Sequence, residues 1–222
     1  MQKTFIRHTL AIITSAILLI FFINFLSTLH SLKAQQSSTF QTKSEQIVHT
    51  LENNQAELEI LKKSLDEDYL TRAKAAEYIF DRQENISLDV REMQYLANLL
   101  NVDELHVIDG NGMIVSGSVS QYVGIDMADH PQTSAFLSLL DAEDDAFLIQ
   151  EPQPNAAEEK VMQYVGVARK GIKGVVQVGF EPTRQMEAQS RNTYEYIFSQ
   201  FPTDTGEELY AVDISTGEIL GH

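Results

Sequence analysis

Residues 104–117 read Glu-Leu-His-Val-Ile-Asp-Gly-Asn-Gly-Met-Ile-Val-Ser-Gly, and they predict a tight β-hairpin. Two runs with high β-propensity, 105–108 and 113–116, flank the Asp-Gly-Asn-Gly sequence at 109–112. Glycine, asparagine and aspartate tolerate the positive φ angles that a short hairpin turn requires. We therefore expect these residues to form the first two strands of a sheet.

A similar pattern returns at residues 208–221, where Glu-Leu-Tyr-Ala-Val-Asp is followed by Ile-Ser-Thr-Gly and then Glu-Ile-Leu-Gly. The second copy has one more residue in its turn. A repeat at domain-sized spacing predicts two related modules in tandem, with residues 202–222 as the truncated start of the second. We expect residues 209–220 to be poorly ordered or misplaced in isolation, because a single hairpin has no partner for its apolar faces. Protease resistance of that segment would contradict this.

The composition is that of a folded, acidic protein. The chain has 222 residues, of which 43% are hydrophobic, and this is enough for one or two domains with a core. Its formal net charge of −16 repels nucleic acid and anionic lipid, so neither is an expected partner of the bulk of the protein. The absence of cysteine excludes disulfides, thiolate zinc sites and a cysteine nucleophile.

The N-terminal segment predicts a transmembrane helix over residues 9–27. Residues 10–25 are apolar apart from three uncharged polar side chains, and residues 9–26 as a helix reach roughly 27 Å, close to the thickness of a bilayer core. Lys3 and Arg7 precede this run, so residues 1–8 are expected in the cytoplasm and residues after about 30 outside the plasma membrane. The alternative is a cleaved signal peptide ending at Ala34, but Leu32 would then occupy a position that requires a small residue.

A long helix is predicted over residues 35–82. Its seam has heptad spacing and continues after a phase slip of four residues, and it consists of Phe40, Ser44, Ile47, Leu51, Asn54, Leu58, Leu61 and Leu65, then Tyr69, Ala73, Ala76 and Phe80. One interpretation is a parallel homodimer stalk that passes a change in packing toward the membrane. The other is an amphipathic helix that lies along its own domain. The spacing is compatible with both.

The remaining pattern predicts an α+β module over residues 88–181. Ser87 or Asp89 is expected to cap a short helix that ends before the turn at 101–103. After the hairpin come a short helical pattern at 135–140 and three further strands at 146–150, 161–168 and 175–180. The expected product is a five-stranded antiparallel sheet with a helical insertion between its second and third strands. A connecting helix is expected over residues 182–201, with Pro182 in its first turn.

This order of elements resembles the extracytoplasmic Cache (PAS-like) sensor domains of bacterial receptors. The resemblance covers about residues 35–222 and rests on the long juxtamembrane helix, the 105–117 hairpin, the 122–127 segment and the 161–180 hairpin, and the later 208–221 repeat makes the double-Cache arrangement the best match. It implies a membrane receptor whose outer module binds a small molecule and whose output, a histidine kinase, a diguanylate cyclase or a chemotaxis module, lies outside this sequence. The Tyr, Arg, Trp and Asp motif of amino-acid-binding members is not found, and the chain has no tryptophan.

The resemblance also implies a pocket between the sheet and residues 122–140. Candidate ligand-binding residues with polar reach are Tyr122, Asp126, Tyr164 and Arg169. Arg169 or its neighbour Lys170 is suited to pair with a ligand carboxylate. The alternative for each residue is structural: the tyrosines pack in the core, and Arg169 is a surface charge at the end of a hairpin. The six histidines show no metal-ligand spacing, and no catalytic or phosphate-binding motif occurs, so no catalytic residue, metal or cofactor is predicted.

The sequence therefore predicts a non-enzymatic small-molecule sensing module of a membrane signal-transduction receptor. The expected partners are a small ligand such as one that bears a carboxylate, the lipid bilayer through residues 9–27, and a second copy of the chain. The alternative is a membrane-anchored protein that binds a protein partner or only dimerises, without a small-molecule ligand. An exposed apolar patch would favour that alternative.

Overall fold

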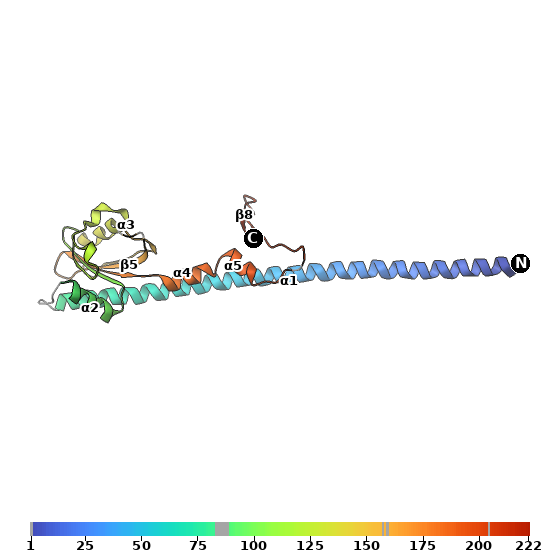
Figure 1. Ribbon diagram of the computed structural model, residues 1–222, viewed down its shortest axis with the longest axis horizontal. Helices are drawn as coiled ribbons and strands as arrows, with labels where there is room; N and C mark the ends of the chain where they lie inside the picture. The colour runs from blue at the N-terminus through green and yellow to red at the C-terminus, as the bar shows by residue number, and fades with distance from the viewer. Residues whose placement is uncertain (1, 83–88, 157, 159, 204) are drawn as a thin grey trace. The chain divides into compact units, whose positions relative to one another are not determined.

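The structure is a computed structural model that describes residues 2–82, 89–156, 158, 160–203 and 205–222. The chain forms two compact units, one of residues 55–191 and one of residues 1–54 together with 192–222. Figure 1 shows the course of the chain. The first unit carries the large sheet, and each unit is described by itself.

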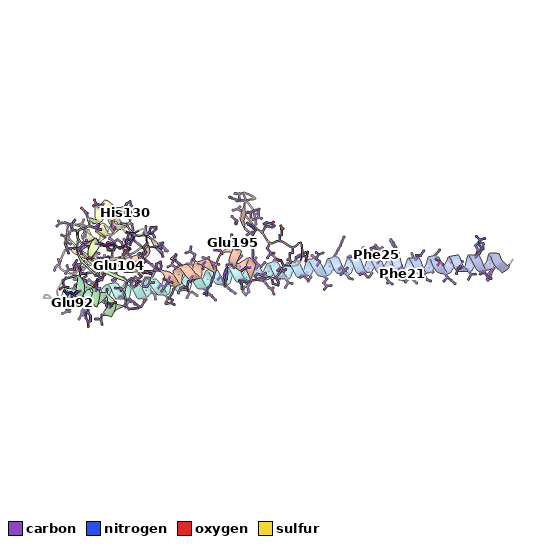
Figure 2. All side chains as sticks on the ribbon, in the orientation of Figure 1. Phe21, Phe25, Glu92, Glu104, His130 and Glu195 are labelled. Carbon is purple, nitrogen blue, oxygen red and sulfur yellow. The ribbon has the colours of Figure 1, made fainter. Side chains whose placement is uncertain are left out.

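Helix α1 is continuous from Gln2 to Arg82. It includes both the predicted transmembrane segment and the predicted helix at 35–82, with no break between them. Among the described residues it is the one helix long and apolar enough to cross a membrane. Side chains such as Phe21 and Phe25 project from its N-terminal half without protein contacts to bury them, as Figure 2 shows.

The C-terminal part of α1 packs against its own domain. Its buried residues recur every three or four positions, at Leu65, Tyr69, Ala73, Ala76 and Phe80, as the predicted phase slip requires. Ala73 and Ala76 are fully buried, and their small side chains let the helix approach the sheet closely. The Tyr69 ring stacks on Phe180 with a centroid distance of 3.7 Å. This part of the predicted seam therefore contacts the chain itself, as in the amphipathic interpretation, and dimerisation stays a prediction.

A second helix, α2, spans Val90–Leu100 and packs its buried residues Met93, Leu96 and Ala97 into the same core. Its N-cap is Asp89, whose side chain accepts hydrogen bonds from the amides of residues 91 and 92. The Asp89 prediction is confirmed, whereas Ser87, the other candidate, lies outside the described residues. Asn101 ends the helix with a left-handed backbone, as the predicted turn requires.

The predicted hairpin consists of β1 (Glu104–Asp109) and β2 (Ile114–Gly117), which pair antiparallel with a bulge after Val107. The Asp109 carboxylate accepts hydrogen bonds from the amides of Asn111 (2.9 Å) and Met113 (3.0 Å), and these bonds lower the pKa of Asp109. Gly112 has the positive φ, +87°, that closes the turn. The hairpin is thus encoded locally.

The main sheet has the strand order β2-β1-β6-β5-β3 and is antiparallel throughout. Its further strands are β3 (Phe147–Ile149), β5 (Val161–Ala168) and β6 (Gly174–Phe180), and the two-residue strand β4 (Gln153–Pro154) also pairs with β5. This confirms the α+β class and the order of the five predicted strands. The central pair β1–β6 brings together segments about seventy residues apart.

The two faces of the sheet face two different cores because side chains alternate along each strand. Leu105, Val107, Val165, Val176 and Val178 pack toward α1 and α2. The opposite face is covered by the segment that links β2 to β3, which contains the 3-10 helices η1 (Ser120–Tyr122), η2 (Met127–Asp129) and η3 (Ala135–Asp141) and the short helix α3 (Pro131–Ser134). In Figure 1 α2 lies beside the end of α1, and α3 lies on the other side of the sheet.

The predicted single connecting helix at 182–201 is wrong, since the segment contains two helices. Helix α4 spans Thr183–Ser190, and α5 spans Tyr194–Ser199. Thr193 ends the continuity because its hydroxyl accepts a hydrogen bond from the amide of Tyr196, as an N-cap does. The boundary between the two compact units falls at this break, between residues 191 and 192.

The other unit contains the repeated hairpin, formed by β7 (Ala211–Val212) and β8 (Ile219–Gly221). Asp213 accepts hydrogen bonds from the amides of Ser215 and Thr216, so its turn has the same aspartate-centred construction as the turn at Asp109. Ion pairing joins this segment to α1, where Lys43 Nζ lies 2.6 Å from Glu207 Oε1. The predicted poor order of residues 209–220 in isolation stays a prediction.

Candidate ligand-binding site

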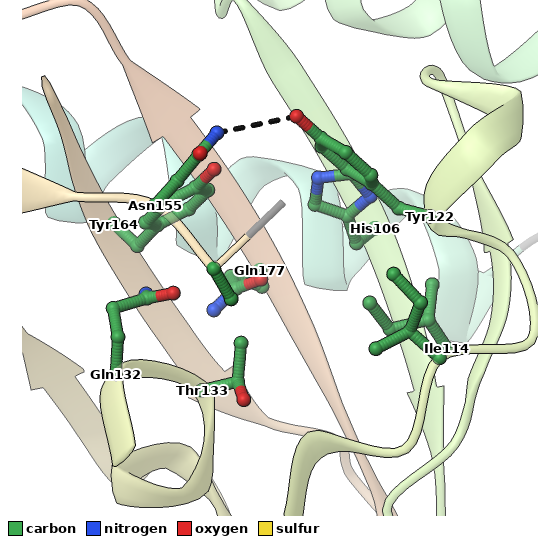
Figure 3. A pocket seen from close by; sticks show the side chains of 10 residues that line it. His106, Ile114, Tyr122, Gln132, Thr133, Asn155, Tyr164 and Gln177 are labelled. Carbon is green, nitrogen blue, oxygen red and sulfur yellow. Dashed lines mark hydrogen bonds between the residues drawn. The ribbon is translucent and has the colours of Figure 1, made fainter. Parts of the chain in front are cut away.

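A cavity lies on the face of the sheet that is turned away from α1. Its volume is about 30 Å³, well below the usual range for small-molecule sites, so a ligand larger than a few water molecules requires its walls to move apart. Strands β1, β5 and β6 form its floor, and the segments around η1, α3 and β4 form its walls (Figure 3). The lining residues are His106, Ile114, Tyr122, Ile125, Gln132, Thr133, Asn155, Ala156, Tyr164 and Gln177.

A buried acid supports the floor of the cavity. Glu104 Oε2 accepts a hydrogen bond of 2.7 Å from the Tyr164 hydroxyl and lies 3.1 Å from His106 Nε2. All three side chains are buried. Burial, and then the charge of Glu104, raise the pKa of the Tyr164 hydroxyl far above its usual range, so Tyr164 is a neutral donor. For the Glu104 carboxylate to accept this second hydrogen bond, His106 Nε2 must carry the N–H.

The centre of the floor is Gln177 on β6. Its neighbours in register are His106 on β1 and Gly166 on β5, and Gly166 leaves room beside the glutamine for Phe136. Gln177 is only 3% exposed, and its Nε2 atom has no hydrogen-bond partner within the described part of the chain. Figure 3 shows the Gln177 carboxamide between the walls of the cavity. A buried donor without a partner is costly, so it marks a place where a ligand group can be recognised.

One wall is closed by contacts between two segments that are distant in sequence. Asn155 Nδ2, which follows β4, donates a hydrogen bond of 3.2 Å to the hydroxyl of Tyr122 in η1, shown as the dashed line in Figure 3. The neighbouring Gln121 donates from its side chain to Glu158. Burial, and then the charge of Glu104, raise the pKa of Tyr122. The Tyr122 ring lies 5.5 Å from the His106 ring, centroid to centroid, so this wall and the floor are in contact.

The opposite wall is formed by Gln132 and Thr133 on α3. Gln132 Nε2 donates to Gln150 Oε1 at 2.9 Å, and Gln150 Nε2 donates back to the Gln132 carbonyl at 2.7 Å. The Thr133 hydroxyl donates to the Met127 carbonyl at 2.7 Å. These bonds hold α3 in place and leave the wall polar but uncharged.

Of the four predicted site residues, the structure brings Tyr122 and Tyr164 together at the cavity. Asp126 is placed elsewhere and acts as the N-cap of η2, because its carboxylate accepts from the Ala128 amide at 2.9 Å. Arg169 lies at the end of the β5–β6 hairpin, where its amide donates to the Gly174 carbonyl, and it does not line the cavity. A ligand-binding role stays a prediction for all four residues.

Five polar lining residues were not predicted, namely His106, Gln132, Thr133, Asn155 and Gln177. A signal for Gln177 is present, because it interrupts the apolar run Val175-Val176-Gln177-Val178-Gly179 of a strand with both faces buried. His106 gives a similar signal between Leu105 and Val107. Gln132 and Thr133 lie in the short helix α3, Asn155 directly follows β4, and nothing in the local sequence pattern marks these residues. None of the described residues forms a group of three or more acids and histidines that could hold a metal ion.

Neither a protein-family comparison nor a comparison with curated proteins gives a match. Solved structures do resemble the chain. They include the ligand-binding domain of the Campylobacter jejuni chemoreceptor Tlp3 in complex with L-valine, with 14% identity, a TM-score of 0.44 and coverage of 68% of this chain and 65% of that one. The sensor domain of the V. cholerae histidine kinase DctB has 13% identity, a TM-score of 0.45 and coverage of 64% and 60%. The E. coli DcuS sensor domain has 12% identity, a TM-score of 0.39 and coverage of 59% and 98%.

These neighbours are sensor or ligand-binding domains, the class that the Cache resemblance implies. The chain spans less than two thirds of the Tlp3 and DctB chains. At these identities and TM-scores the likeness is one of fold alone. The functional argument rests on the cavity.

Proposed function

We propose that residues 55–191 bind a small molecule in the cavity, as the extracytoplasmic sensing module of a membrane signal-transduction receptor. The observation that carries this proposal is the position of the cavity on the sheet. One face of β5 places Tyr164 in the cavity, and the other face places Val165 against the core that includes α1. One layer of backbone therefore separates a bound ligand from the helix that continues into the apolar N-terminal segment.

Two polar contacts tie β5 and its hairpin to α1. Gln163 Nε2 donates to Asp66 Oδ1 at 2.8 Å, and the Lys170 amide donates to Glu77 Oε1 at 3.1 Å. Glu77 is buried, which makes this contact hard to replace with water. A ligand that favours one position of β5 shifts the equilibrium between arrangements of β5 on α1. In this proposal that shift is the signal.

The proposal includes the membrane topology expected from the sequence. Residues 9–27 of α1 cross the plasma membrane, residues 1–8 lie in the cytoplasm, and the sensing module lies outside. The output domain belongs to another part of a longer receptor. A homodimer is the proposed assembly, since anchoring in a membrane concentrates the chains in a plane and makes weak association effective.

A thermal-shift screen of the full chain in detergent tests ligand binding. The compounds are small carboxylates, carboxamides, amino acids, amines, nucleobases and divalent cations. A ligand present at a hundred times its dissociation constant stabilises the native state by about 2.7 kcal/mol, which is a readily measured shift. A hit should disappear in Gln177→Leu and persist in Gln185→Leu, because Gln185 is a similarly buried glutamine that does not line the cavity. A hit abolished by Arg169→Ala instead would move the site to the hairpin end.

Partner binding is the second candidate, and exposed apolar side chains on α2 favour it. Tyr95 and Leu99 lie four residues apart, on one side of the helix, and are 61% and 63% exposed. A partner or a second copy would cover them. If no compound shifts the melting temperature, while Tyr95→Ser with Leu99→Ser abolishes self-association of the full chain, the dimerising role replaces the sensor.

A further inference from the structure

The cavity has an uncharged lining. Within the described part of the chain, its ten lining residues include no lysine, arginine, aspartate or glutamate, and the titratable ones are His106 and two tyrosines. The polar surface is otherwise made of the side chains of Gln132, Thr133, Asn155 and Gln177. The charge that a ligand would meet is therefore set by groups behind the lining.

An anionic ligand is disfavoured at this site. Burying a carboxylate requires a charged or strongly donating partner, and the nearest acid behind the floor, Glu104, would repel it. The basic residues of the β5–β6 hairpin do not compensate, because Lys170 Nζ pairs with Asp145 Oδ1 at 3.1 Å and Lys173 Nζ pairs with Asp141 Oδ1 at 2.7 Å. Arg169 does not line the cavity.

A cationic ligand is also poorly matched. Glu104, the carboxylate that supports the floor, is not among the described lining residues. Its Oε2 atom already faces Tyr164 and His106 at hydrogen-bonding distance. An ammonium group in the cavity would be buried without a direct ion-pair partner among the described lining residues, which is costly.

The Gln177 carboxamide determines which class of ligand is complementary to the cavity. A carboxamide presents an N–H donor and a C=O acceptor side by side, and a second carboxamide is complementary to it, donor to acceptor and acceptor to donor. A carboxylate offers only acceptors, and an ammonium offers only donors. We infer that the ligand presents an uncharged carboxamide-type edge, a C=O beside an N–H, to Gln177, with its apolar body against Ile114 and Ile125. This inference rests on the proposed function and specifies the ligand class.

The other unpartnered atom of the floor, His106 Nδ1, is less suited to ligand recognition. A Cβ on Gly117 would lie 2.6 Å from Nδ1, so this edge of the imidazole is packed against the backbone of β2. The ring nitrogen on the other side contacts Glu104. His106 thus holds Glu104 in place beneath the cavity, whereas Gln177 is the residue that forms hydrogen bonds with the ligand.

Isosteric compounds that differ only in charge give the sharpest test. The first set is nicotinamide, nicotinate and 3-(aminomethyl)pyridine, and the second is succinamide, succinate and 1,4-diaminobutane. Binding of each to the full chain in detergent is measured by isothermal titration calorimetry at pH 7.5. One set carries a pyridine ring and the other a four-carbon chain. In the set whose apolar part fits the cavity, we expect the amide to bind at least about tenfold more tightly than the acid and the amine.

Variants at position 177 assign the preference to the glutamine. Gln177→Met keeps the length of the side chain without its polar atoms, and we expect it to weaken amide binding about tenfold. The matched control Gln185→Met should bind as the wild type does. Gln177→Lys adds a cation to the floor and should reverse the preference in favour of the acid, an outcome that a purely structural role of Gln177 would not produce.

The outcomes separate this inference from the proposed function. An acid or amine that binds as tightly as its amide, or a Gln177→Met variant that binds amides normally, overturns the inference and leaves the sensor proposal standing. A screening hit that lacks the C=O and N–H edge does the same. If no compound of any class binds, the proposed function fails and the inference fails with it.

Discussion

The Tyr164 hydroxyl donates a hydrogen bond of 2.7 Å to Glu104 Oε2 across the strand that lies between them. Tyr164 is on β5, Glu104 is on β1, and β6 separates the two strands. The ring passes over Gly179, where an added Cβ would come within 2.7 Å of Tyr164 Cε1. One hydrogen bond therefore fixes the relative position of three strands under the cavity.

Removing this hydroxyl should destabilise the domain while the ring stays in place. Tyr164→Phe deprives the buried Glu104 of a hydrogen bond, and hydrogen bonds to charged groups contribute about 1.5–3 kcal/mol. The expected loss in the free energy of unfolding is of that size, measured by urea denaturation of the full chain. Tyr78→Phe is the control, because Tyr78 is exposed and should change stability by less than about 0.5 kcal/mol. Equal losses in both variants would contradict the assignment.

Alkaline pH should reveal the same contact. The pKa of Tyr164 is raised in the folded state by burial and by Glu104, whereas an unfolded tyrosine ionises near pH 10. Because the folded state holds this proton more tightly, the contribution is complete below about pH 10 and is lost as the pH rises above it. The melting temperature of the wild type should therefore fall between about pH 9 and 11 more steeply than that of Tyr164→Phe. Parallel profiles would count against this.

The close approach at Gly179 predicts a steric effect. In Gly179→Ala the new methyl group meets an aromatic ring that cannot move without breaking its bond to Glu104, so we expect a loss of about 1–3 kcal/mol. The comparison variant is Gly110→Ala, whose methyl group would lie 3.2 Å from Lys173 Cβ, Cγ and carbonyl oxygen, a less severe approach than 2.7 Å that should cost less. Urea denaturation of both variants is the measurement. An effect of Gly179→Ala no larger than that of Gly110→Ala would show that the strands under the cavity can shift to accommodate the methyl group.

The buried Glu77 should act as a hydrogen-bond acceptor for the β5–β6 hairpin. Glu77→Gln keeps an oxygen for the Lys170 amide, whereas Glu77→Met keeps most of the packing and removes the acceptor. We expect Glu77→Met to cost about 1–3 kcal/mol more than Glu77→Gln, because it leaves a backbone donor without its partner. Hydrogen exchange of the Lys170 amide should be faster in Glu77→Met. Equal exchange in the two variants would exclude this role.

The parts of the fold that the sequence predicted are those whose signal is local. The turn at Asp109 and the cap at Asp89 are made by side chains that contact amides within four residues, so the pattern and the structure coincide. The break at Thr193 uses the same chemistry, but the apolar spacing across it favoured a continuous helix. Heptad spacing predicts that the 35–82 seam is buried against some surface. It does not specify whether that surface belongs to the helix's own domain or to a second chain.

The site was harder to predict because its members meet only through strand pairing. Gln177 and His106 become neighbours by the register of β1 with β6, which joins residues 71 positions apart. Asn155 reaches Tyr122 from a loop whose course no periodicity describes. Tyr122 and Tyr164 line the cavity, which lies between the sheet and the 122–140 segment, as the Cache resemblance implies. Arg169 was a candidate because of its charge, but it lies at the end of the β5–β6 hairpin.

The contact between Asp66 and Gln163 predicts a stabilising substitution. Burial raises the pKa of Asp66, and Gln163 Oε1 is a buried acceptor without a partner in the described chain. Since the folded state favours the protonated acid, the contribution of Asp66 is favourable below its ordinary pKa of 3.8 and is lost as the pH rises through the folded value. At pH 7 the ionised carboxylate therefore contributes less to the free energy of unfolding than the protonated acid does at low pH.

Asp66→Asn should remove this loss. The amide keeps an acceptor for Gln163 Nε2 and adds a donor for Gln163 Oε1, a gain of about 0.5–1.5 kcal/mol in the free energy of unfolding at pH 7. The advantage should shrink as the pH falls through the raised folded pKa of Asp66 toward its ordinary value of 3.8, because the folded acid then becomes protonated. Asp68→Asn is the control of opposite sign, because it breaks the exposed 2.7 Å ion pair with Arg72. A less stable Asp66→Asn variant at pH 7 would show that the charge holds β5 against α1, so that this link depends on ionisation.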